Sequence, residues 1–273
     1  MTEKIFELND VHFSYLGKFP ALQGITINVE RGELVTVIGA NGSGKSTLLQ
    51  LLDGLIFPDR GRITAFSEEL SEKLLNNEAF SRSFRKKVGL VFQDSSIQLF
   101  CPTVEEDILF GPVQLGLPEP DIRRRLNQLT ELLGIQELLS RSPHRLSIGE
   151  RKKVAIASTL IGRPDVLLLD EPTAGLDPAT TRHIIEILIG FHRQGKTLVI
   201  STHDLNLAEE LGGTIHVFGH EKRIVASGKA EDILKNEALL QDNNLTHSHI
   251  HRHGGSLHSH PHSSATHHQQ HDL

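Results

Sequence analysis

Cysteine is almost missing from this chain of 273 residues, in which Cys101 stands alone. A single cysteine excludes an internal disulfide and a cysteine-based zinc site, and it is typical of a reducing compartment. No apolar run approaches the roughly 18 residues that a membrane-spanning helix needs, and the start of the chain carries charges throughout. We therefore expect a cytosolic protein without a signal peptide that contacts a membrane only through a partner.

An excess of basic residues is missing as well. The net charge is -6 with neutral histidines, and the isoelectric point is about 6.3. Proteins that bind nucleic acid neutralise its phosphates with a basic surface, so we expect no nucleic-acid partner. The chain is long enough to bury one large core.

The hydrophobic pattern changes along the chain. Apolar and polar residues alternate over 4–15 and 22–30, which predicts antiparallel strands with one solvated face. Residues 33–40 and 165–170 are nearly continuous apolar runs, which are typical of parallel strands covered on both sides.

Helical patterns separate these strands. Amphipathic helices are predicted over 121–135 and 178–194, and a strand over 196–202. The alternation of strand and helix predicts an α/β fold. Three helix starts carry capping signals, namely capping boxes at Thr103 with Glu106 and at Ser147 with Glu150, and an N-cap at Asp177 before Pro178.

Residues 39–46, Gly-Ala-Asn-Gly-Ser-Gly-Lys-Ser, match the phosphate-loop pattern and lie between a predicted buried strand and a predicted helix. The glycines let backbone N–H groups and the helix N-terminus face phosphate oxygens, and Lys45 adds a positive charge. Ser46 is expected to complete a Mg²⁺ shell and Thr47 to hold a neighbouring phosphate oxygen. An ordinary glycine-rich turn is the alternative, but it does not need the Lys-Ser-Thr triplet. The predicted nucleotide contacts in this loop are Gly39, Asn41, Gly42, Gly44, Lys45, Ser46 and Thr47.

Two carboxylates, Asp170 and Glu171, follow the strand predicted at 166–169. Ligands bind at the carboxyl ends of parallel strands in α/β sheets. We expect Asp170 to hold Mg²⁺, directly or through water, and Glu171 to polarise the water that attacks the terminal phosphoryl group. A solvated strand end is the alternative for an isolated acidic pair, and the preceding phosphate loop weakens that alternative.

Residues 146–150, Leu-Ser-Ile-Gly-Glu, resemble the signature motif of ABC-type ATPases. Other motifs of that family agree in order and spacing. The resemblance implies a P-loop NTPase ABC ATPase fold with a RecA-like core, an antiparallel β subdomain and a helical subdomain. The further matches are Tyr15 to the adenine-stacking aromatic residue, Gln93 to the Q-loop glutamine, residues 174–177 to the D-loop and His203 to the switch histidine.

The resemblance also implies a division of the chain. Residues 1–230 are expected to form the ATPase domain, with the helical insert at about 94–162. A short helical segment is expected at 231–246, and residues 247–273 are predicted to be a histidine-rich unfolded tail.

The resemblance implies that two such subunits face each other head to tail, as a homodimer or as a heterodimer of related chains. Ser147 and Gly149 would then open a helix toward the ATP held by the other subunit's phosphate loop. Taken singly, a lone tyrosine is ordinarily packing, Gln93 a loop residue and His203 a core or helix-start histidine. The implied catalytic residues are Glu171, His203 and Gln93, the Mg²⁺ ligands are Ser46, Gln93 and Asp170, and the further nucleotide contacts are Tyr15, Ser147, Gly149 and Asp177.

The signature departs from the commonest family pattern at two positions, with Ile148 in place of glycine and Glu150 in place of glutamine. We expect the backbone at Ile148 to avoid positive φ and Glu150 to serve as the capping-box acid. Slower or altered turnover is an open alternative.

Residues 92–107 and 110–112 look like the energy-coupling-factor group of importers, and its cobalt and nickel members match best. In that group the region after the Q-loop contacts a coupling helix of a transmembrane protein. Leu99 and Phe100 beside the acidic residues 105–107 are predicted to form such a socket, with an ordinary capped loop as the alternative. The implied function is an ATPase at the cytoplasmic face of the cell membrane that energises nickel or cobalt uptake together with transmembrane coupling and substrate-binding subunits.

Other functions stay open at this point. Zinc import is the nearest alternative, because histidine tracts suit zinc too. A soluble ABC ATPase of DNA repair or the ribosome ordinarily has two cassettes or a long coiled coil, whereas this chain has one phosphate loop and no sustained heptads. A metal-storage protein with a regulatory nucleotide site is less consistent with an intact Glu171 and His203.

Ten of the seventeen histidines lie in the last 27 residues. Imidazole prefers Ni²⁺, Co²⁺, Cu²⁺ and Zn²⁺ to Mg²⁺ or Ca²⁺, so we predict a metal-binding tail in addition to the ATP and Mg²⁺ of the nucleotide site. A cloning tag and solvated low complexity are the alternatives. The candidate tail ligands are His247, His249, His251, His253, His258, His260 and His262.

Overall fold

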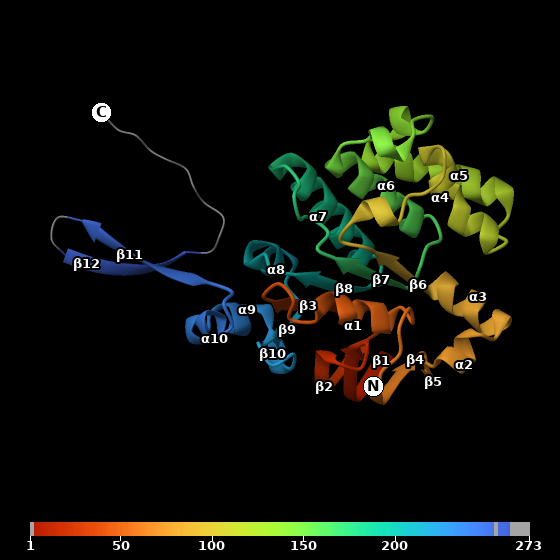
Figure 1. The fold of residues 1–273 in the computed structure, drawn as a ribbon. Helices are drawn as coiled ribbons and strands as arrows, with labels where there is room; N and C mark the ends of the chain where they lie inside the picture. Colours follow the sequence, from red (N-terminus) through yellow and green to blue (C-terminus); the bar gives the residue numbers. More distant parts are fainter. Residues whose placement is uncertain (1–2, 254–255, 263–273) are drawn as a thin grey trace, which may run out of the picture.

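The computed structural model describes the backbone of residues 3–253 and 256–262 and the side chains of residues 3–246. Strands and helices alternate there around a four-stranded sheet and a six-stranded sheet, and helices lie on both sides of the larger sheet (Figure 1). This architecture confirms the predicted α/β fold.

The larger sheet carries the strands that end at the candidate site. Its strands run parallel, except that the most C-terminal strand of the sheet, at one edge, pairs antiparallel with its neighbour. In order across the sheet the strands are β10 (Ile224–Lys229), β9 (Thr214–Phe218), β3 (Leu34–Gly39), β8 (Thr197–Thr202), β7 (Val166–Asp170) and β6 (Val88–Val91).

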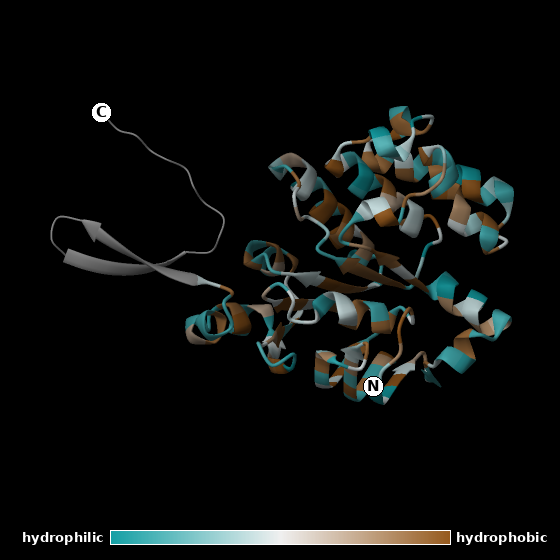
Figure 2. Ribbon diagram, viewed as in Figure 1, coloured by the Kyte–Doolittle hydropathy of each residue, from teal (hydrophilic) through white to brown (hydrophobic). Residues whose placement is uncertain are grey.

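Strand β7 shows why the central strands of this sheet are mostly apolar. Leu167 and Leu169 belong to one apolar cluster, whereas Val166 and Leu168 belong to the cluster on the other side of the sheet. Side chains alternate between the two faces of a strand, so a strand covered on both sides is apolar at every position. Figure 2 shows this concentration of hydrophobic residues on the central strands. The predicted parallel strands are thus confirmed as β3 and β7.

Helices cover both faces of the larger sheet. The leucines of α1 (Lys45–Leu52) pack with β3 in the cluster that also contains the antiparallel sheet. On the other face, α6 (Ile148–Leu160) and α7 (Pro178–Arg193) pack against β7 and β8. The other helices before residue 212 are α2 (Glu72–Leu75), α3 (Glu78–Lys87), α4 (Val104–Gln114), α5 (Glu119–Leu133) and α8 (Leu205–Leu211), with short 3-10 helices η1 (Ser95–Ile97), η2 (Gln136–Leu138) and η3 (Pro143–Arg145).

The helix signals in the sequence are placed well. The capping boxes at Thr103 and Ser147 are both present, and Asp177 caps α7 as predicted. Helix α5 starts two residues earlier than the predicted helix and ends at Leu133, because Gly134 adopts the left-handed conformation with φ of 63°.

The smaller sheet is antiparallel and packs on the α1 side of the molecule (Figure 1). Its first two strands pair along most of their length, from Lys4 opposite Glu30 to Tyr15 opposite Phe19. This confirms the antiparallel strands expected near the N-terminus. In order across the sheet the strands are β2 (Phe19–Glu30), β1 (Lys4–Tyr15), β4 (Arg60–Ala65) and β5 (Glu68–Glu69).

Two short helices, α9 (Ala230–Leu234) and α10 (Glu237–Asp242), follow the larger sheet. Ile233 and Leu240 of these helices share an apolar cluster with Ile215 and Val217 of β9. Among the described residues, no helix combines the length and apolar character that crossing a membrane requires.

The histidine-rich segment differs from the unfolded tail that the sequence predicts. Its backbone pairs as two antiparallel strands, β11 (His247–His253) and β12 (Ser256–His262). Histidine occupies every second position over 247–253 and again over 258–262, a pattern of period two that suits extended backbone. The metal role predicted for the seven histidines concerns side chains outside the described part of the chain, and residues 263–273 lie outside it entirely, so these expectations stay predictions.

Candidate functional site

The phosphate loop joins β3 to α1 and is held by close packing. Gly44 has φ of 114°, and a Cβ atom at this position would lie 2.4 Å from the carbonyl oxygen of Ala21. Only glycine fits such a conformation and approach. Lys45 begins α1, and its Nζ donates hydrogen bonds to the carbonyl oxygens of Gly39 at 2.8 Å and Ala40 at 3.3 Å. The ammonium group is thereby held inside the loop.

A cavity of about 400 Å³ opens over this loop. It brings together most of the predicted nucleotide contacts, and its lining residues come from five separate parts of the chain. Phe19 and Lys222, which sequence reasoning missed, lie in the same wall. The residues that line it are Tyr15, Phe19, Pro20, Ala21, Asn41, Gly42, Ser43, Gly44, Lys45, Ser46, Thr47, Gln93, Glu171 and Lys222.

Two aromatic side chains stand at one end of this cavity. Tyr15 and Phe19 are paired in register between β1 and β2 and are 42% and 63% exposed. The Tyr15 hydroxyl lies 3.1 Å from that of Thr47 and donates to Gln50 at 3.4 Å. An exposed aromatic surface that is anchored by its hydroxyl suits stacking against a planar base. No sequence signal pointed to Phe19, because the predicted second strand begins only at residue 22, whereas β2 begins at Phe19.

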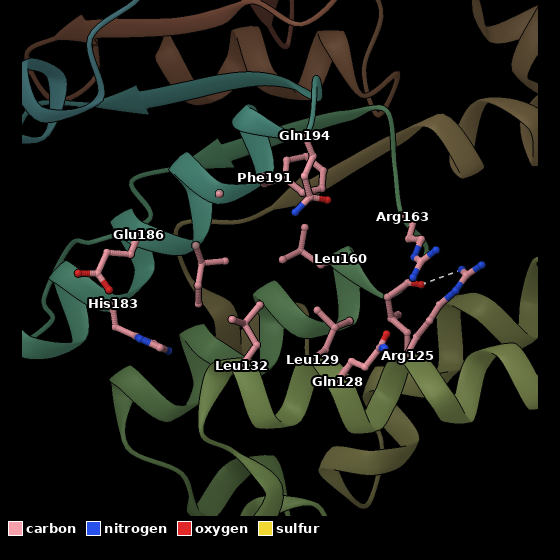
Figure 3. A pocket seen from close by; sticks show the side chains of 13 residues that line it. Arg125, Gln128, Leu129, Leu132, Leu160, Arg163, His183, Glu186, Phe191 and Gln194 are labelled. Atoms are coloured by element: carbon pink, nitrogen blue, oxygen red, sulfur yellow. Dashed lines mark hydrogen bonds between the residues drawn. The ribbon is translucent and has the colours of Figure 1, made fainter.

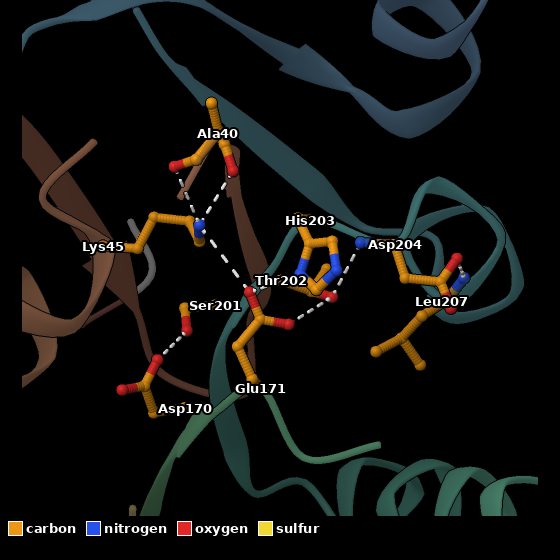
Figure 4. A network of polar contacts seen from close by, with 10 residues as sticks. Ala40, Lys45, Asp170, Glu171, Ser201, Thr202, His203, Asp204 and Leu207 are labelled. Carbon is orange, nitrogen blue, oxygen red and sulfur yellow. Dashed lines mark hydrogen bonds and ion pairs between the residues drawn. The ribbon is translucent and has the colours of Figure 1, made fainter. Parts of the chain in front are cut away.

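Glu171 follows β7 and is the centre of a polar network (Figure 4). Its Oε1 lies 2.9 Å from His203 Nδ1 and 3.6 Å from Lys45 Nζ. Thr202 donates its hydroxyl to Oε2 at 3.2 Å. Glu171 is buried and has φ of 44°, a conformation that costs a non-glycine residue about 1–3 kcal/mol. Such strain at a buried carboxylate is typical of functional positions.

Lys45 is also affected by its surroundings. Burial lowers the pKa of Lys45, and the nearby Glu171 and Asp170 carboxylates oppose that shift. Desolvation disfavours an ammonium ion, whereas opposite charges within a few ångströms favour it. The cluster therefore holds a cation and an anion that are both poorly solvated and ready to interact with a charged ligand.

Asp170, Ser46 and Gln93 fit a magnesium site by their chemistry. The Asp170 carboxylate is buried, and its Oδ1 accepts the hydroxyl proton of Ser201, while its Oδ2 has no hydrogen-bond partner among the described residues. Ser46 and Gln93 line the phosphate-loop cavity. Hydroxyl, carboxylate and amide oxygens are the hard ligands that Mg²⁺ prefers, and phosphate oxygens ordinarily complete its shell.

Ser147 and Gly149 open α6 but do not line the phosphate-loop cavity. Glu150 Oε2 accepts the N–H of Ser147 at 2.7 Å, and Ser147 Oγ accepts the N–H of Glu150 at 3.2 Å. The hydrogen bond from the Ser147 N–H to the carboxylate is the main cause of the lowered pKa of Glu150. The reciprocal pair of bonds confirms Glu150 as the capping-box acid. Ile148 lies in the first helical turn without positive φ, as the sequence predicts, and its side chain is 58% exposed.

Gln93 lies on the exposed segment between β6 and η1. Lys152 of α6, which sequence reasoning missed, donates from Nζ to the carbonyl oxygens of Phe92 at 3.1 Å and Gln93 at 2.8 Å. Lys152 is 2% exposed, and burial lowers its pKa to about 8. The Gln93 backbone is thus tied to the helix that Ser147 begins. No sequence signal indicated that the Lys152 side chain, about one turn into this helix, points toward the protein interior.

Asp177 acts locally in this chain. Its Oδ1 accepts the N–H groups of Ala179 and Thr180, both at 3.0 Å, and its Oδ2 accepts the Thr180 hydroxyl at 2.7 Å. The Thr180 hydroxyl is the main cause of the lowered pKa of Asp177. The nucleotide contact predicted for Asp177 stays a prediction.

The predicted apolar socket is partly wrong. Leu99 is 3% exposed and belongs to the core, because it packs with Val104 and Ile108 of α4. Phe100 is 62% exposed and packs edge to face on Phe110, with ring centroids 4.9 Å apart. The exposed apolar surface is therefore a pair of phenylalanines that are ten residues apart in the sequence.

A second cavity of about 410 Å³ lies between α5, α6 and α7 (Figure 3). Its floor contains Leu129, Leu160 and Phe191, and Arg125 and Arg163 lie together at one end. No residue of the phosphate loop, of the end of β7 or of the segment around His203 lines it. The chemistry gathered around Lys45 and Glu171 makes the first cavity the candidate active site.

Comparison with curated proteins shows what this chain is similar to. Residues 22–174 match the family described as ABC transporter. A putative ABC transporter ATP-binding protein of Methanosarcina acetivorans is 46% identical over 92% of this chain and 92% of its own length. The nickel import ATP-binding protein NikO of Rhodobacter capsulatus is 47% identical, with 86% of this chain and 93% of NikO covered. The energy-coupling factor transporter ATP-binding protein EcfA of Methanothermobacter thermautotrophicus is 41% identical over 87% of this chain and 75% of EcfA.

Solved structures give the same result. The cbiO1 protein of Clostridium perfringens, described as part of the ABC transporter complex cbiONQ, superposes with a TM-score of 0.74 at 34% identity, covering 89% of this chain and 95% of cbiO1. The ATP-binding cassette MJ0796, as a dimer bound to ADP and phosphate, has a TM-score of 0.74 at 27% identity, covering 83% and 99%.

Proposed function

This chain belongs to the family of ABC transporter ATP-binding proteins, and we propose that it is the ATPase of an importer for nickel or cobalt ions. One observation carries the catalytic part of this proposal: Lys45 and His203 converge on the buried Oε1 of Glu171. Zinc import is the alternative substrate assignment. The supporting relatives are those named for nickel import and for a cbiONQ complex.

In the proposed reaction Glu171 polarises a water molecule whose oxygen attacks the γ-phosphorus, and the bond to the bridging oxygen of ADP breaks. The first products are ADP and phosphate, and Glu171 takes up the proton that the water releases. His203 orients Glu171, because its ring nitrogen lies 2.9 Å from the carboxylate. In this proposal His203 also hydrogen-bonds the terminal phosphate. Lys45 stabilises the charge on the phosphate oxygens. Gln93 couples the presence of bound nucleotide to the conformation of the helical insert at about 94–162.

Mg²⁺, held by Ser46, Asp170 and Gln93, would supply neutralisation of the phosphate charge. Tyr15 stacks on the adenine ring in this proposal, and the loop residues from Gly39 to Thr47 hold the phosphates.

Ser147 and Gly149 are proposed to serve the site of a facing subunit. They lie at a helix N-terminus whose N–H groups favour an anion, and they lie outside the cavity formed by their own phosphate loop. A head-to-tail pair supplies each ATP with one loop and one signature helix. The pair consists of two copies or of this chain with a related one, and Asp177 lies near the contact between them in this proposal.

We propose that Phe100 and Phe110 contact a transmembrane coupling subunit at the cytoplasmic face of the membrane. Both are exposed, Phe110 lies on α4 together with Glu105 and Glu106, and Phe100 follows Gln93 by seven residues. An aromatic pair with a charged rim is typical of a protein interface. The histidine tail is proposed to bind the transported ion close to the importer, because imidazole suits nickel, cobalt and zinc.

Uptake measurements test the proposal. Cells that express this chain with the transmembrane proteins that copurify with it are expected to accumulate radioactive nickel or cobalt, and cells with Glu171→Gln in the same complex are not. Accumulation of zinc, and of neither nickel nor cobalt, would overturn the substrate assignment and leave the importer assignment standing. ATP hydrolysis without copurification of any transmembrane protein would overturn the importer assignment and favour a soluble ABC ATPase.

A further inference from the structure

Lys222 lies in the turn between β9 and β10, with an unusual backbone conformation. Its φ is 60°, which side chains other than glycine rarely adopt. The turn is closed by hydrogen bonds from Lys222 N–H to Gly219 at 3.2 Å and from Gly219 N–H to Arg223 at 2.9 Å. Gln23 of β2 donates its N–H to the Lys222 carbonyl oxygen at 2.9 Å. The position of this strained residue is therefore fixed from both sides.

Sheet topology brings this turn to the phosphate loop. Strands β3 and β9 are parallel neighbours, and Gly39 at the end of β3 lies opposite Phe218 at the end of β9. A Cβ atom on Gly39 would approach Phe218 Cβ to 2.9 Å. Because both strands end at the same edge, the residues that follow them meet although they are 180 residues apart in the sequence.

The Lys222 side chain points into the active-site cavity. Its Nζ donates a hydrogen bond to the carbonyl oxygen of Gly42 in the phosphate loop, and Lys222 lines the cavity with Lys45. An ammonium group has three donors, so two remain after this bond. Within the described residues no carboxylate pairs with Lys222, and the neighbouring Glu221 pairs with Arg223 at 4.0 Å instead.

We propose that Lys222 is a second cationic ligand for the triphosphate of ATP, supplied by the β9–β10 turn. This inference rests on the proposed ATPase site and adds a binding residue to it. The ammonium bridges the Gly42 carbonyl and the phosphate oxygens, so that Lys45 and Lys222 contact the phosphate chain from two sides. A strained backbone at a cation without a carboxylate partner fits a position kept for ligand binding.

Titration of the full-length protein with the fluorescent analogue mant-ATP tests the proposal. Lys222→Gly relieves the backbone strain, so it is expected to melt at the same temperature as the wild type or above it, while the Kd for mant-ATP rises about five- to tenfold from the lost charge–phosphate contact. Lys222→Arg keeps the charge and is expected to stay within about threefold of the wild type.

A further variant distinguishes phosphate binding by Lys222 from a purely structural hydrogen bond to the phosphate loop, and another serves as a control. Lys222→Gln still donates to Gly42 without a charge, so it is expected to bind as weakly as Lys222→Gly. Arg163→Gly is the matched control, because Arg163 also has positive φ, of 54°, and lines the other cavity. Its Kd is expected to be unchanged.

Wild-type affinity in Lys222→Gly, or full rescue by Lys222→Gln, would overturn the role of Lys222 while leaving the ATPase assignment intact. If the wild type itself fails to bind mant-ATP, the ATPase assignment fails first.

Discussion

Glu171 Oε1 lies 2.9 Å from Nδ1 of His203, although the two residues come from the ends of different strands. Strands β7 and β8 are parallel neighbours, with Asp170 opposite Ser201, so the residues just beyond them meet at one edge of the sheet. The carboxylate is buried, whereas the histidine side chain is 48% exposed. The pair therefore combines a carboxylate that is buried in the protein with a histidine ring that is partly open to solvent.

Glu171→Gln is expected to reduce ATP hydrolysis by about 100-fold or more while ATP binding is kept, because the amide cannot accept the proton from water. The ATP-bound pair of subunits should then accumulate. Phosphate release and size-exclusion chromatography with ATP measure the two effects. Glu210→Gln on the exposed face of α8 is the control and is expected to behave as the wild type. Normal turnover in Glu171→Gln would remove Glu171 from its proposed role.

Two inactive variants are expected to restore each other if the chain pairs with itself. Lys45→Ala disables the phosphate loop, and Ser147→Asp places a negative charge at the signature helix while keeping a good N-cap. Random mixing puts half of the chains in mixed dimers with one intact site each, so about a quarter of the wild-type ATPase activity should return. A steady-state ATPase assay at several mixing ratios checks this. No recovery, together with activity of the wild type as a monomer, would contradict the shared site.

Phe100→Ala is expected to weaken binding of a transmembrane partner by about tenfold or more, because an exposed aromatic pair is typical of the energetically dominant centre of an interface. ATPase activity of the isolated chain should not change. Copurification from detergent-solubilised membranes measures the first effect. Leu132→Ala, at an apolar residue with 51% exposure beside the other cavity, is the matched control. Equal copurification of both variants would place the partner elsewhere.

Asp53 is expected to make stability depend on pH. Burial raises the pKa of Asp53 to about 6 from 3.8, although Arg85 donates to its Oδ2 at 2.8 Å and opposes the shift. Because the folded-state pKa is raised, the stabilisation is fully present below pH 3.8 and is lost as the pH rises through 6. The change is at most about 3 kcal/mol.

Asp53→Asn removes this titration. Urea denaturation between pH 4 and pH 7 should show the free energy of unfolding of the wild type falling relative to that of Asp53→Asn as the pH rises. Other groups titrate equally in both proteins, so the difference isolates Asp53. Parallel curves would mean that the Asp53 carboxyl keeps an ordinary pKa.

The tail is expected to account for transition-metal binding outside the nucleotide site. Among the side chains that the structure describes, no group of three or more His, Cys, Asp and Glu residues is placed to hold a metal ion. Calorimetry with Ni²⁺ and Co²⁺ should therefore show binding to the full chain and little binding to a chain that ends at Leu245. A full-length variant with glutamine at the seven candidate histidines controls for chain length. Equal binding by all three proteins would rule the tail out.

Contiguous segments could be predicted because their chemistry is local. The phosphate loop from Gly39 to Ser46 needs glycines for its backbone and a lysine at the helix start, and both requirements are visible in the sequence. Capping at Ser147 and Asp177 likewise depends on residues two or three positions away. The order of the motifs was enough to identify the family and the α/β fold.

Burial could not be predicted side chain by side chain. Leu99 and Phe100 are adjacent and both apolar, yet Leu99 enters the core and Phe100 remains exposed. A lysine in a helix is ordinarily at the surface, but Lys152 is buried and its Nζ donates hydrogen bonds to the carbonyl oxygens of Phe92 and Gln93. Which side chain faces the core depends on how α4 and α6 pack against the larger sheet, and the sequence pattern specifies that orientation only loosely.

By itself, the sequence determined which reactive groups the protein has and which short loops hold them, since local backbone geometry depends on neighbouring residues. Only the tertiary structure decided which groups meet, because strand order is set by the packing of distant apolar surfaces. The adjacency of β3 and β9 placed Lys45 and Lys222 at one cavity, and the adjacency of β7 and β8 brought His203 to Glu171, which lines the same cavity. Nothing in the spacing of these residues along the chain required that meeting.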